Sequence, residues 1–317
     1  MIVLTLLLFV LSCILLVASG SFLVKSLVII TRFLKISEYM GAFIIMAFST
    51  SLPELFIAIS SAMAKNSALA FGTVIGSNIA DITLIGGIAV ILARKVKITR
   101  LAIKTDVIAM IALAALPMIL MLIGQTLSRI DAAILLIVFI AYSIHLMKTK
   151  KKYKTKLKNK IKRIYVIGSV FVFILSLILL YASSHYVVKY GTELALGLFL
   201  PPIFVGLFFL ALGTSLPELV FTVKAMTKNH TEFAIGDLIG SVVMNSTLVL
   251  AVAAFIFPIH VNFFLFLTSA IFMILSTVLF ASFVRSGEKF TYLEGISLLI
   301  LYILFIIVEL NVQQYFV

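Results

Sequence analysis

Two glutamates, each in the middle of an apolar stretch, carry the strongest chemical signal in this 317-residue sequence. Glu54 lies within the apolar segment 39–64, and Glu218 lies within the apolar segment 201–226. Placing an ionisable side chain at the centre of a membrane helix costs at least about 2.5 kcal/mol, so such residues usually mark functional sites. A protonated glutamate that joins two helices by a hydrogen bond is the structural alternative. A pair of such glutamates favours a binding site inside the membrane.

The two glutamates lie in copies of one motif. Residues 47–55 read AFSTSLPEL and residues 211–219 read ALGTSLPEL, while FGTVIGSNIADITL at 71–84 corresponds to IGDLIGSVVMNSTL at 235–248. Every match has the same offset of 164 residues, without a gap. The pattern indicates an internal repeat.

A proline directly precedes each glutamate and weakens the helix there. Pro53 and Pro217 lack a backbone N–H and displace the carbonyl four residues earlier. Unpaired backbone at membrane depth is tolerated only where it is buried in protein or lines a cavity. Carbonyl, hydroxyl and carboxylate oxygens are hard ligands, so the composition favours calcium, sodium or magnesium over zinc or copper.

The spacing of the other polar residues gathers further oxygens around the glutamates. A threonine stands one helical turn before each glutamate, and the next helix of each half carries polar residues at i, i+4 and i+8, which share one face. The threonines are Thr50 and Thr214, and the two stripes are Thr73, Ser77 and Asp81 in the first half and Asp237, Ser241 and Asn245 in the second. Flanking glycines, among them Gly72 and Gly76, allow helices to approach closely. We therefore predict a cation site where the two halves converge.

The elements that position this site are membrane helices. The chain is 63% hydrophobic and 12% charged, with a mean hydropathy of +1.27, which excludes a water-soluble globule. A single cysteine, Cys13, excludes a disulfide framework or a multi-cysteine zinc site within one chain. We predict an all-α polytopic membrane protein with about ten apolar spans: 2–30, 39–64, 68–93, 101–124, 130–147, 164–196, 201–226, 232–257, 260–284 and 292–316.

The spans divide into two repeats of five around a basic loop. The predicted units are 1–147, the loop 148–163, and 164–317. Because five is an odd number, the two copies enter the membrane from opposite sides. Inverted repeats of this kind are typical of secondary transporters, whose sites lie near the midplane.

The net charge of +13 predicts the orientation. All but three of the 25 Lys and Arg residues fall on the side of the 148–163 loop, and the exceptions are Lys65, Arg129 and Lys189. Basic residues concentrate in cytoplasmic loops, so we expect this loop inside and both termini outside. The loop is also expected to contact anionic lipid headgroups, and nothing in the distribution favours nucleic acid as a partner.

The repeated TSLPEL, GSNIAD and GSVVMN segments resemble the alpha repeats of the cation/calcium exchanger superfamily, most closely those of prokaryotic sodium/calcium exchangers. The resemblance covers the whole ten-helix plan. It implies a monomeric transport unit in a prokaryotic cell membrane that moves calcium against sodium by alternating access, without a cofactor.

The resemblance also implies a set of ion ligands. The central calcium site would comprise Glu54, Glu218, Thr50 and Thr214. One flanking sodium site would comprise the Ala47 carbonyl, Thr50, Ser77 and Glu54, and the other the Ala211 carbonyl, Thr214, Ser241 and Glu218. Asp81 and Asn245 would complete the middle, Ser51 and Ser215 of the repeated motif are further candidates, and Asp237, Asn78 and Thr73 are outlying ones.

The sequence departs from the family pattern in ways that leave the coupling ion open. Asp81 and Asn245 stand in the reverse of the order in the familiar archaeal exchangers, and Val242 stands where a second Asn would match Asn78. Ser49 replaces the usual glycine. A proton-coupled antiporter of calcium or another divalent cation is therefore the alternative function, and a channel is a further one.

An enzymatic function is not supported by the sequence. It contains no H-E-x-x-H motif and no G-x-S-x-G motif. Its four histidines, His145, His185, His230 and His260, are scattered, and we interpret them as structural or interfacial residues.

Overall fold

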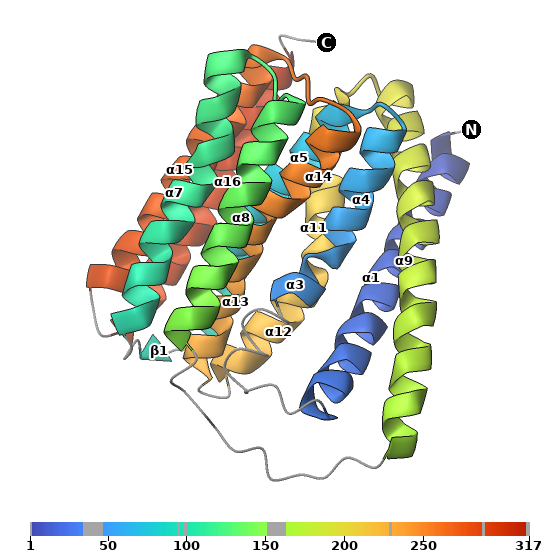
Figure 1. Ribbon diagram of the computed structural model, residues 1–317. Helices are drawn as coiled ribbons and strands as arrows, with labels where there is room; N and C mark the ends of the chain where they lie inside the picture. The colour runs from blue at the N-terminus through green and yellow to red at the C-terminus, as the bar shows by residue number, and fades with distance from the viewer. Residues whose placement is uncertain are drawn as a thin grey trace.

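The computed structural model describes residues 2–33, 47–93, 96–97, 101–150, 163–227, 230–286 and 289–314, which form a helical bundle (Figure 1). The first half contains α1 (Ile2–Phe33), α3 (Ala47–Thr50), α4 (Leu52–Met63), α5 (Ser67–Ala80), the π-helical segment η2 (Asp81–Ile85), α6 (Gly86–Ala93), β1 (Val96–Lys97), α7 (Leu101–Gly124) and α8 (Arg129–Lys150). The second half contains α9 (Arg163–Gly197), α10 (Pro202–Phe204), η3 (Val205–Leu210), α11 (Ala211–Thr214), α12 (Leu216–Thr227), α13 (Thr231–Met244), η4 (Asn245–Val249), α14 (Leu250–Ile256), α15 (Phe263–Ser286), β2 (Lys289–Phe290) and α16 (Tyr292–Gln314).

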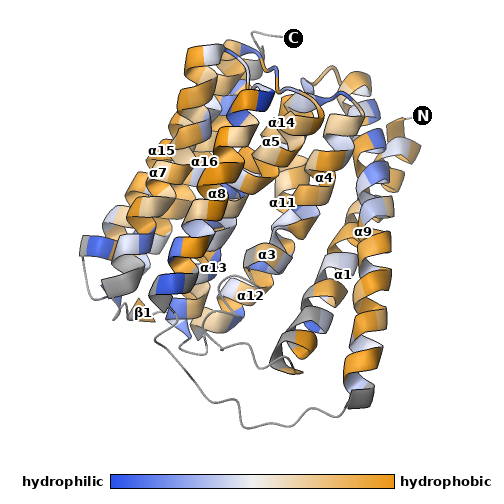
Figure 2. Cartoon of the chain, viewed as in Figure 1, coloured by the Kyte–Doolittle hydropathy of each residue, from blue (hydrophilic) through white to orange (hydrophobic). Residues whose placement is uncertain are grey.

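The helices are long and apolar enough to cross a membrane, as the composition predicts. The described residues contain eight such helices, and a ninth span if the bent pair Pro202–Thr214 and Leu216–Thr227 is counted as one. The predicted segment 39–64 is described only from Ala47 onward. Figure 2 shows hydrophobic residues over most of the length of α1, α7, α8 and α9 and hydrophilic residues near the ends of the bundle. The predicted all-α polytopic membrane fold is confirmed.

The 164-residue repeat is preserved in the backbone. The bounds of α3, α4, α5 and η2 each recur at this offset in α11, α12, α13 and η4. In Figure 1, α4 lies above α3 whereas α12 lies below α11, so the two copies run in opposite directions. This arrangement agrees with the predicted inverted repeat.

The spans that contain Pro53 and Pro217 each break at the residue before the helix that carries the glutamate. Ser51 has φ −81° and ψ 5°, and Ser215 has φ −80° and ψ 5°. Pro53 lies in the first turn of α4, where a missing N–H costs least. The two halves of the broken span in the second repeat, α10–α11 and α12, meet at 46°. The predicted loosening of the helix therefore takes the form of a discrete bend at the repeated serine.

Two glycines let α5 approach α10 and η3 closely. A Cβ atom on Gly72 would lie 2.3 Å from the Ile203 carbonyl oxygen, and one on Gly76 would lie 2.2 Å from the Leu207 carbonyl oxygen. Both contacts are with backbone, which cannot move aside as a side-chain tip can. The predicted close approach at these glycines is confirmed, and it joins one repeat to the other.

The buried apolar residues form two clusters. The smaller one is centred on α1 and α9, which lie side by side at one edge of the bundle (Figure 1), and includes Phe9, Leu16, Leu23 and Leu180. The larger one fills the space among the remaining helices. The polar residues of the predicted site are buried and lie on α3, α4, α5 and η2 of the first repeat and on α11, α12, α13 and η4 of the second.

Short backbone pairings join the two halves at both ends of the bundle. At the end where α8 finishes and α9 starts, β1 pairs antiparallel with β2, with Val96 opposite Phe290. At the end that carries both termini, Leu127 and Ile259 form a two-way β-bridge with N···O distances of 3.0 Å. Within the predicted 148–163 loop, residues 151–162 lie outside the described part of the chain.

Candidate cation site

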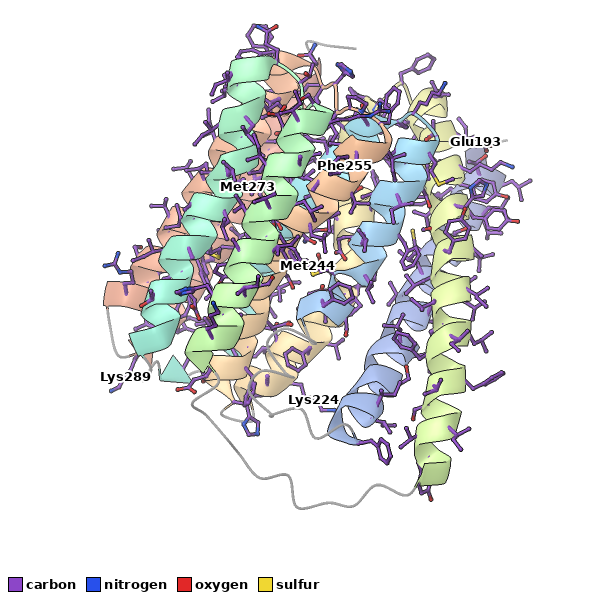
Figure 3. All side chains as sticks on the ribbon, viewed as in Figure 1. Glu193, Lys224, Met244, Phe255, Met273 and Lys289 are labelled. Carbon is purple, nitrogen blue, oxygen red and sulfur yellow. The ribbon has the colours of Figure 1, made fainter. Side chains whose placement is uncertain are left out.

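The repeated polar residues converge in the interior, where the two helix breaks meet α5 and α13. Glu54 and Asp81 are fully buried, and Glu218 is 1% exposed. Figure 3 shows Met244, the residue before Asn245, at mid-height of the bundle. The hydroxyl residues of the predicted site are also buried: Thr50, Ser51, Ser77, Thr214, Ser215 and Ser241. Most of the predicted ligands are thus brought together away from bulk water.

Ser77 connects a glutamate of its own repeat to a threonine of the other. Its hydroxyl donates to Glu54 Oε1 at 3.2 Å and lies 3.1 Å from Thr214 Oγ1. The Thr214 hydroxyl in turn donates to the Ala211 carbonyl oxygen at 3.2 Å. These groups, Glu54, Ser77, Thr214 and the Ala211 carbonyl, offer four oxygens to one small volume.

The corresponding hydroxyls on the other side of the site also pair across the repeats. Thr50 Oγ1 lies 3.4 Å from Ser241 Oγ. The resemblance groups Thr50 with Ser77 and Thr214 with Ser241, whereas the hydroxyl contacts pair Thr50 with Ser241 and Ser77 with Thr214. The physical reason is that α5 packs against α11, and α13 packs against α3. The Ala47 backbone lies in α3, as the predicted carbonyl ligand requires.

Many oxygens of the site are buried without a hydrogen-bond partner. They include Glu54 Oε2, both carboxyl oxygens of Glu218 and of Asp81, and the hydroxyls of Ser51 and Ser215. Buried polar atoms are normally paired, and leaving them unpaired costs free energy. Asp81 also lies within electrostatic range of Glu54 and Asp237. A cation would supply the partner that these oxygens lack.

The carboxylates are spread through the site. Within the described ranges, no three His, Cys, Asp or Glu side chains are grouped so as to hold a single metal ion. An ion bound here would therefore draw on hydroxyl and carbonyl oxygens as well as on carboxylates, as hard cations do.

A π-helical segment begins at the same stripe position in each repeat. Asp81 begins η2 and Asn245 begins η4. The amide atoms of Asn245 have no hydrogen-bond partner. Single π turns within α-helices are frequent at functional sites, because they redirect side chains and free backbone groups. Helical spacing alone does not predict that both stripes end in such a segment.

The outlying candidates lie in different environments. Asn78 donates from Nδ2 to Ser246 Oγ at 2.9 Å, and thus ties α5 to η4. The Thr73 hydroxyl donates to the Leu69 carbonyl of its own helix at 2.8 Å. Asp237 is 2% exposed, and neither of its carboxyl oxygens has a hydrogen-bond partner. Among the three, Asp237 offers the most free coordinating capacity.

A further buried carboxyl, Glu309 in α16, is absent from the predicted site. Its Oε1 accepts hydrogen bonds from Ser269 at 2.7 Å and Thr268 at 3.0 Å, and the side chain is fully buried. Glu309 stands in the apolar segment 292–316, so the rule that singles out Glu54 also applies to it. It has no counterpart at the 164-residue offset, where His145 stands. The described contacts make it a link between α15 and α16.

Both halves of the chain are similar to known proteins. The family model for the sodium/calcium exchanger protein matches residues 4–148 and 168–310. Sodium/calcium exchanger MaX1 of Methanosarcina acetivorans is 28% identical over 97% of this chain and 99% of its own length. Inner membrane protein YrbG of Escherichia coli is 26% identical over 84% of each chain. The solved structure of the sodium-calcium exchanger NCX_Mj soaked with Na⁺ and Sr²⁺ is similar with a TM-score of 0.69 and 25% identity, covering 96% of this chain and 98% of that one.

Proposed function

Because the chain belongs to the sodium/calcium exchanger protein family, whose members are membrane transporters and not enzymes, we propose that it is a secondary active antiporter that exchanges calcium for sodium by alternating access. One observation carries the proposal: buried carboxylate and hydroxyl oxygens from both inverted repeats converge, and many lack a hydrogen-bond partner. The similar proteins include sodium/calcium exchangers, which supports this choice of ions.

The proposed ligand sets follow the contacts between the repeats. Calcium binds centrally between Glu54 and Glu218, with Thr50 and Thr214 beside them, and Asp81 and Asn245 complete the middle. One flanking sodium binds among Glu54, Ser77, Thr214 and the Ala211 carbonyl, whose oxygens form a chain of three contacts. The other binds among Glu218, Ser241, Thr50 and the Ala47 carbonyl, around the Thr50–Ser241 contact. Ser51 and Ser215 lie at the helix breaks as further oxygen donors.

Charge neutralisation gives the exchange a physical basis. The two glutamates carry two negative charges, which either one calcium ion or two sodium ions neutralise. Both ions use the same oxygens, so they compete for them. A buried charge that lacks compensation is costly, and a protein that changes state only when its site is neutral therefore exchanges ions without leaking them.

We further propose that the connection 148–163 faces the cytoplasm and that both termini face outside. The described ends of α8 and α9, Lys150 and Arg163, lie at the end of the bundle opposite to the termini (Figure 1). The basic residues on that side support the orientation, because such residues are retained in the cytoplasm and attract anionic headgroups. The transport unit is proposed to be the monomer.

The test is uptake of radioactive calcium into proteoliposomes loaded with sodium, with potassium, or with a pH gradient alone. We expect uptake only with the outward sodium gradient. Glu193→Gln is the matched control, because Glu193 is an exposed acid near the end of α9 (Figure 3). Uptake that follows the pH gradient and ignores sodium would replace this function with proton-coupled calcium antiport.

Proton-coupled antiport remains the second candidate because of one observation. Asp81 and Asp237 add two buried carboxyls, with no hydrogen-bond partner on any of their oxygens, to the two glutamates. Four such acids exceed what one calcium ion neutralises, and carboxylates can carry protons as well as metal ions. The pH-gradient arm of the same experiment separates the two candidates.

A further inference from the structure

The second repeat contains a buried polar layer that the first repeat lacks. We propose that Asp237, Thr222 and Thr50 form an additional binding site for one sodium-like monovalent cation, between the central site and the end of the bundle where α8 and α9 meet their connection. The transport role of this site rests on the proposed function, whereas its capacity to bind a cation does not.

The register of the helix hairpins brings Thr222 and Asp237 to one level. In the first repeat, the Ser77–Glu54 hydrogen bond at 3.2 Å fixes how α4 and α5 lie against each other. The bounds of α12 and α13 repeat those of α4 and α5 at the offset of 164, and the two helices pack against each other. Ser241 and Glu218 therefore lie at matching levels, although the Glu218 carboxyl accepts no hydrogen bond. Thr222 follows Glu218 by four residues, and Asp237 precedes Ser241 by four. Because α12 and α13 are antiparallel, Thr222 and Asp237 each lie one helical turn nearer to the α12–α13 connection than Glu218 and Ser241 do. The distance along the helix axis is about 6 Å.

The oxygens of this layer are buried and unpaired. Thr222 is fully buried, and its hydroxyl has no hydrogen-bond partner. Helical threonines usually donate to the carbonyl of the preceding turn, as Thr73 does to Leu69 and Thr247 does to Val243. Thr222 does not use the Glu218 carbonyl in this way. The Thr222 hydroxyl and the two carboxyl oxygens of Asp237 are therefore three buried oxygens without a hydrogen-bond partner.

Thr50 supplies the third side chain and connects the layer to the main site. Its hydroxyl lies next to the Asp237 carboxyl, and its Oγ1 is 3.4 Å from Ser241 Oγ. Because α3 packs against α13, this threonine of the first repeat faces the stripe of the second. An ion that leaves the flanking sodium set around Thr50 and Ser241 would meet Asp237 next.

The layer exists on one side of the molecule only. At the offset of 164, Ala58 replaces Thr222, and Thr73 replaces Asp237. Alanine has no side-chain oxygen, and the Thr73 hydroxyl is engaged with its own helix. Figure 3 shows Lys224, two residues beyond Thr222, near the lower end of the bundle, so the polar layer lies between the midplane and that end. The two approaches to the central site therefore differ in charge.

The charge of the layer selects the kind of ion. One carboxylate and two neutral hydroxyls are neutralised by one monovalent cation, whereas a divalent cation would leave an excess positive charge in a buried place. Oxygen ligands of this type suit hard cations, and sodium is the monovalent member of the proposed transported pair.

The experiment compares the full-length wild type with Asp237→Asn and with the double change Thr222→Ala and Asp237→Thr, which copies the first repeat's Ala58–Thr73 pair. Sodium bound per protein is measured by equilibrium dialysis with radioactive sodium in detergent. We expect one sodium fewer in both variants, and the same number as wild type in Glu193→Gln. Equal sodium binding in Asp237→Asn and wild type would overturn the proposal. Size-exclusion chromatography verifies that each variant is folded. If Asp237→Asn fails to fold, Thr222→Val is tested in its place, and it should bind sodium more weakly than the wild type.

A second measurement tests the one-sidedness of the layer. In membrane vesicles of both orientations, Asp237→Asn should weaken the apparent sodium affinity about tenfold from the side of the α8–α9 connection and leave it unchanged from the other side. An equal effect from both sides would contradict the placement. If the wild type binds the additional sodium but exchanges no calcium for sodium, the proposed function fails and the site stands.

Discussion

The Ser77 hydroxyl lies 3.1 Å from Thr214 Oγ1, although 137 residues separate the two along the chain. The contact joins the polar stripe of the first repeat to the TSLPEL motif of the second, and Ser77 also donates to Glu54 Oε1. A change at either residue should therefore disturb the same flanking ion set.

Ser77→Ala and Thr214→Val should each weaken the sodium dependence of calcium uptake, and the double variant should be little worse than either single one. The reason is that both changes damage one shared set of oxygens, and residues in contact are not additive. The measurement is the sodium concentration for half-maximal exchange in proteoliposomes. Independent, multiplied effects in the double variant would show that the two hydroxyls serve different ions.

Glu54→Gln and Glu218→Gln should each abolish exchange while the protein remains folded. Each removes one of the two charges that calcium requires, yet keeps the size of the side chain. The checks are calcium uptake and a monodisperse elution profile, with Glu193→Gln as the control for losing an acid outside the site. Near-normal transport by either variant would remove that glutamate from the calcium site.

Gly76→Ala should destabilise the fold, because its Cβ would lie 2.2 Å from the Leu207 carbonyl oxygen. Overpacking of this kind costs about 1–3 kcal/mol. Gly168→Ala in α9 is the matched control, since nothing lies within 4 Å of its Cβ, and helix propensity favours alanine there. Thermal unfolding in detergent should show a lower midpoint for Gly76→Ala only. Equal midpoints would mean that the helices separate easily at this contact.

Asn78→Val should destabilise the protein by leaving Ser246 without its donor, at a cost of about 1–3 kcal/mol. The double change Asn78→Val and Ser246→Ile copies Val242 and Ile82, the residues at the equivalent positions, and should recover part of the loss. Thermal unfolding measures both. A double variant less stable than the single one would show that the polar pair itself is required.

Glu309→Gln should keep near-wild-type stability, because its amide oxygen can still accept from Ser269 and Thr268. Glu309→Ala should lose both hydrogen bonds and loosen α15 from α16. The difference in unfolding midpoint between the two variants is the test. Loss of calcium exchange in Glu309→Gln at unchanged stability would instead assign Glu309 to transport.

The sequence predicts those features that depend on local composition or on an identity within the chain. Apolar runs define the helices, the 164-residue offset defines the two copies, and Pro53 and Pro217 mark the helix breaks. The spacing of Ser77 and Asp81 shows which residues share a helix face. It does not show which helix of the other repeat that face meets, and so the crossed pairing of Ser77 with Thr214 was not predicted.

Other features leave little or no trace in a single sequence. The π-helical segments at Asp81 and Asn245 arise from packing between the repeats, so no local pattern marks them. The Asn78–Ser246 link joins residues that have no spacing rule in common. Glu309 is different, because its position in an apolar segment marks it in the sequence although it is not part of the repeat.

The backbone pairings at the two ends of the bundle join the two repeats at their connections. β1 and β2 join the connections beside α7 and α16 at one end, and the Leu127–Ile259 bridge joins the connections beside α8 and α15 at the other. The first pairing thus ties α7 to α16, and the second ties α8 to α15. Neither of these two pairings involves α1 or α9. The smaller apolar cluster is centred on these two helices and also includes Leu52, Ile57 and Val205 of neighbouring elements. The described backbone pairings thus tie elements of the two repeats together, whereas α1 and α9 are held to the rest of the bundle by side-chain contacts, among them the Ser60–Ser184 and Asn66–Thr192 hydrogen bonds.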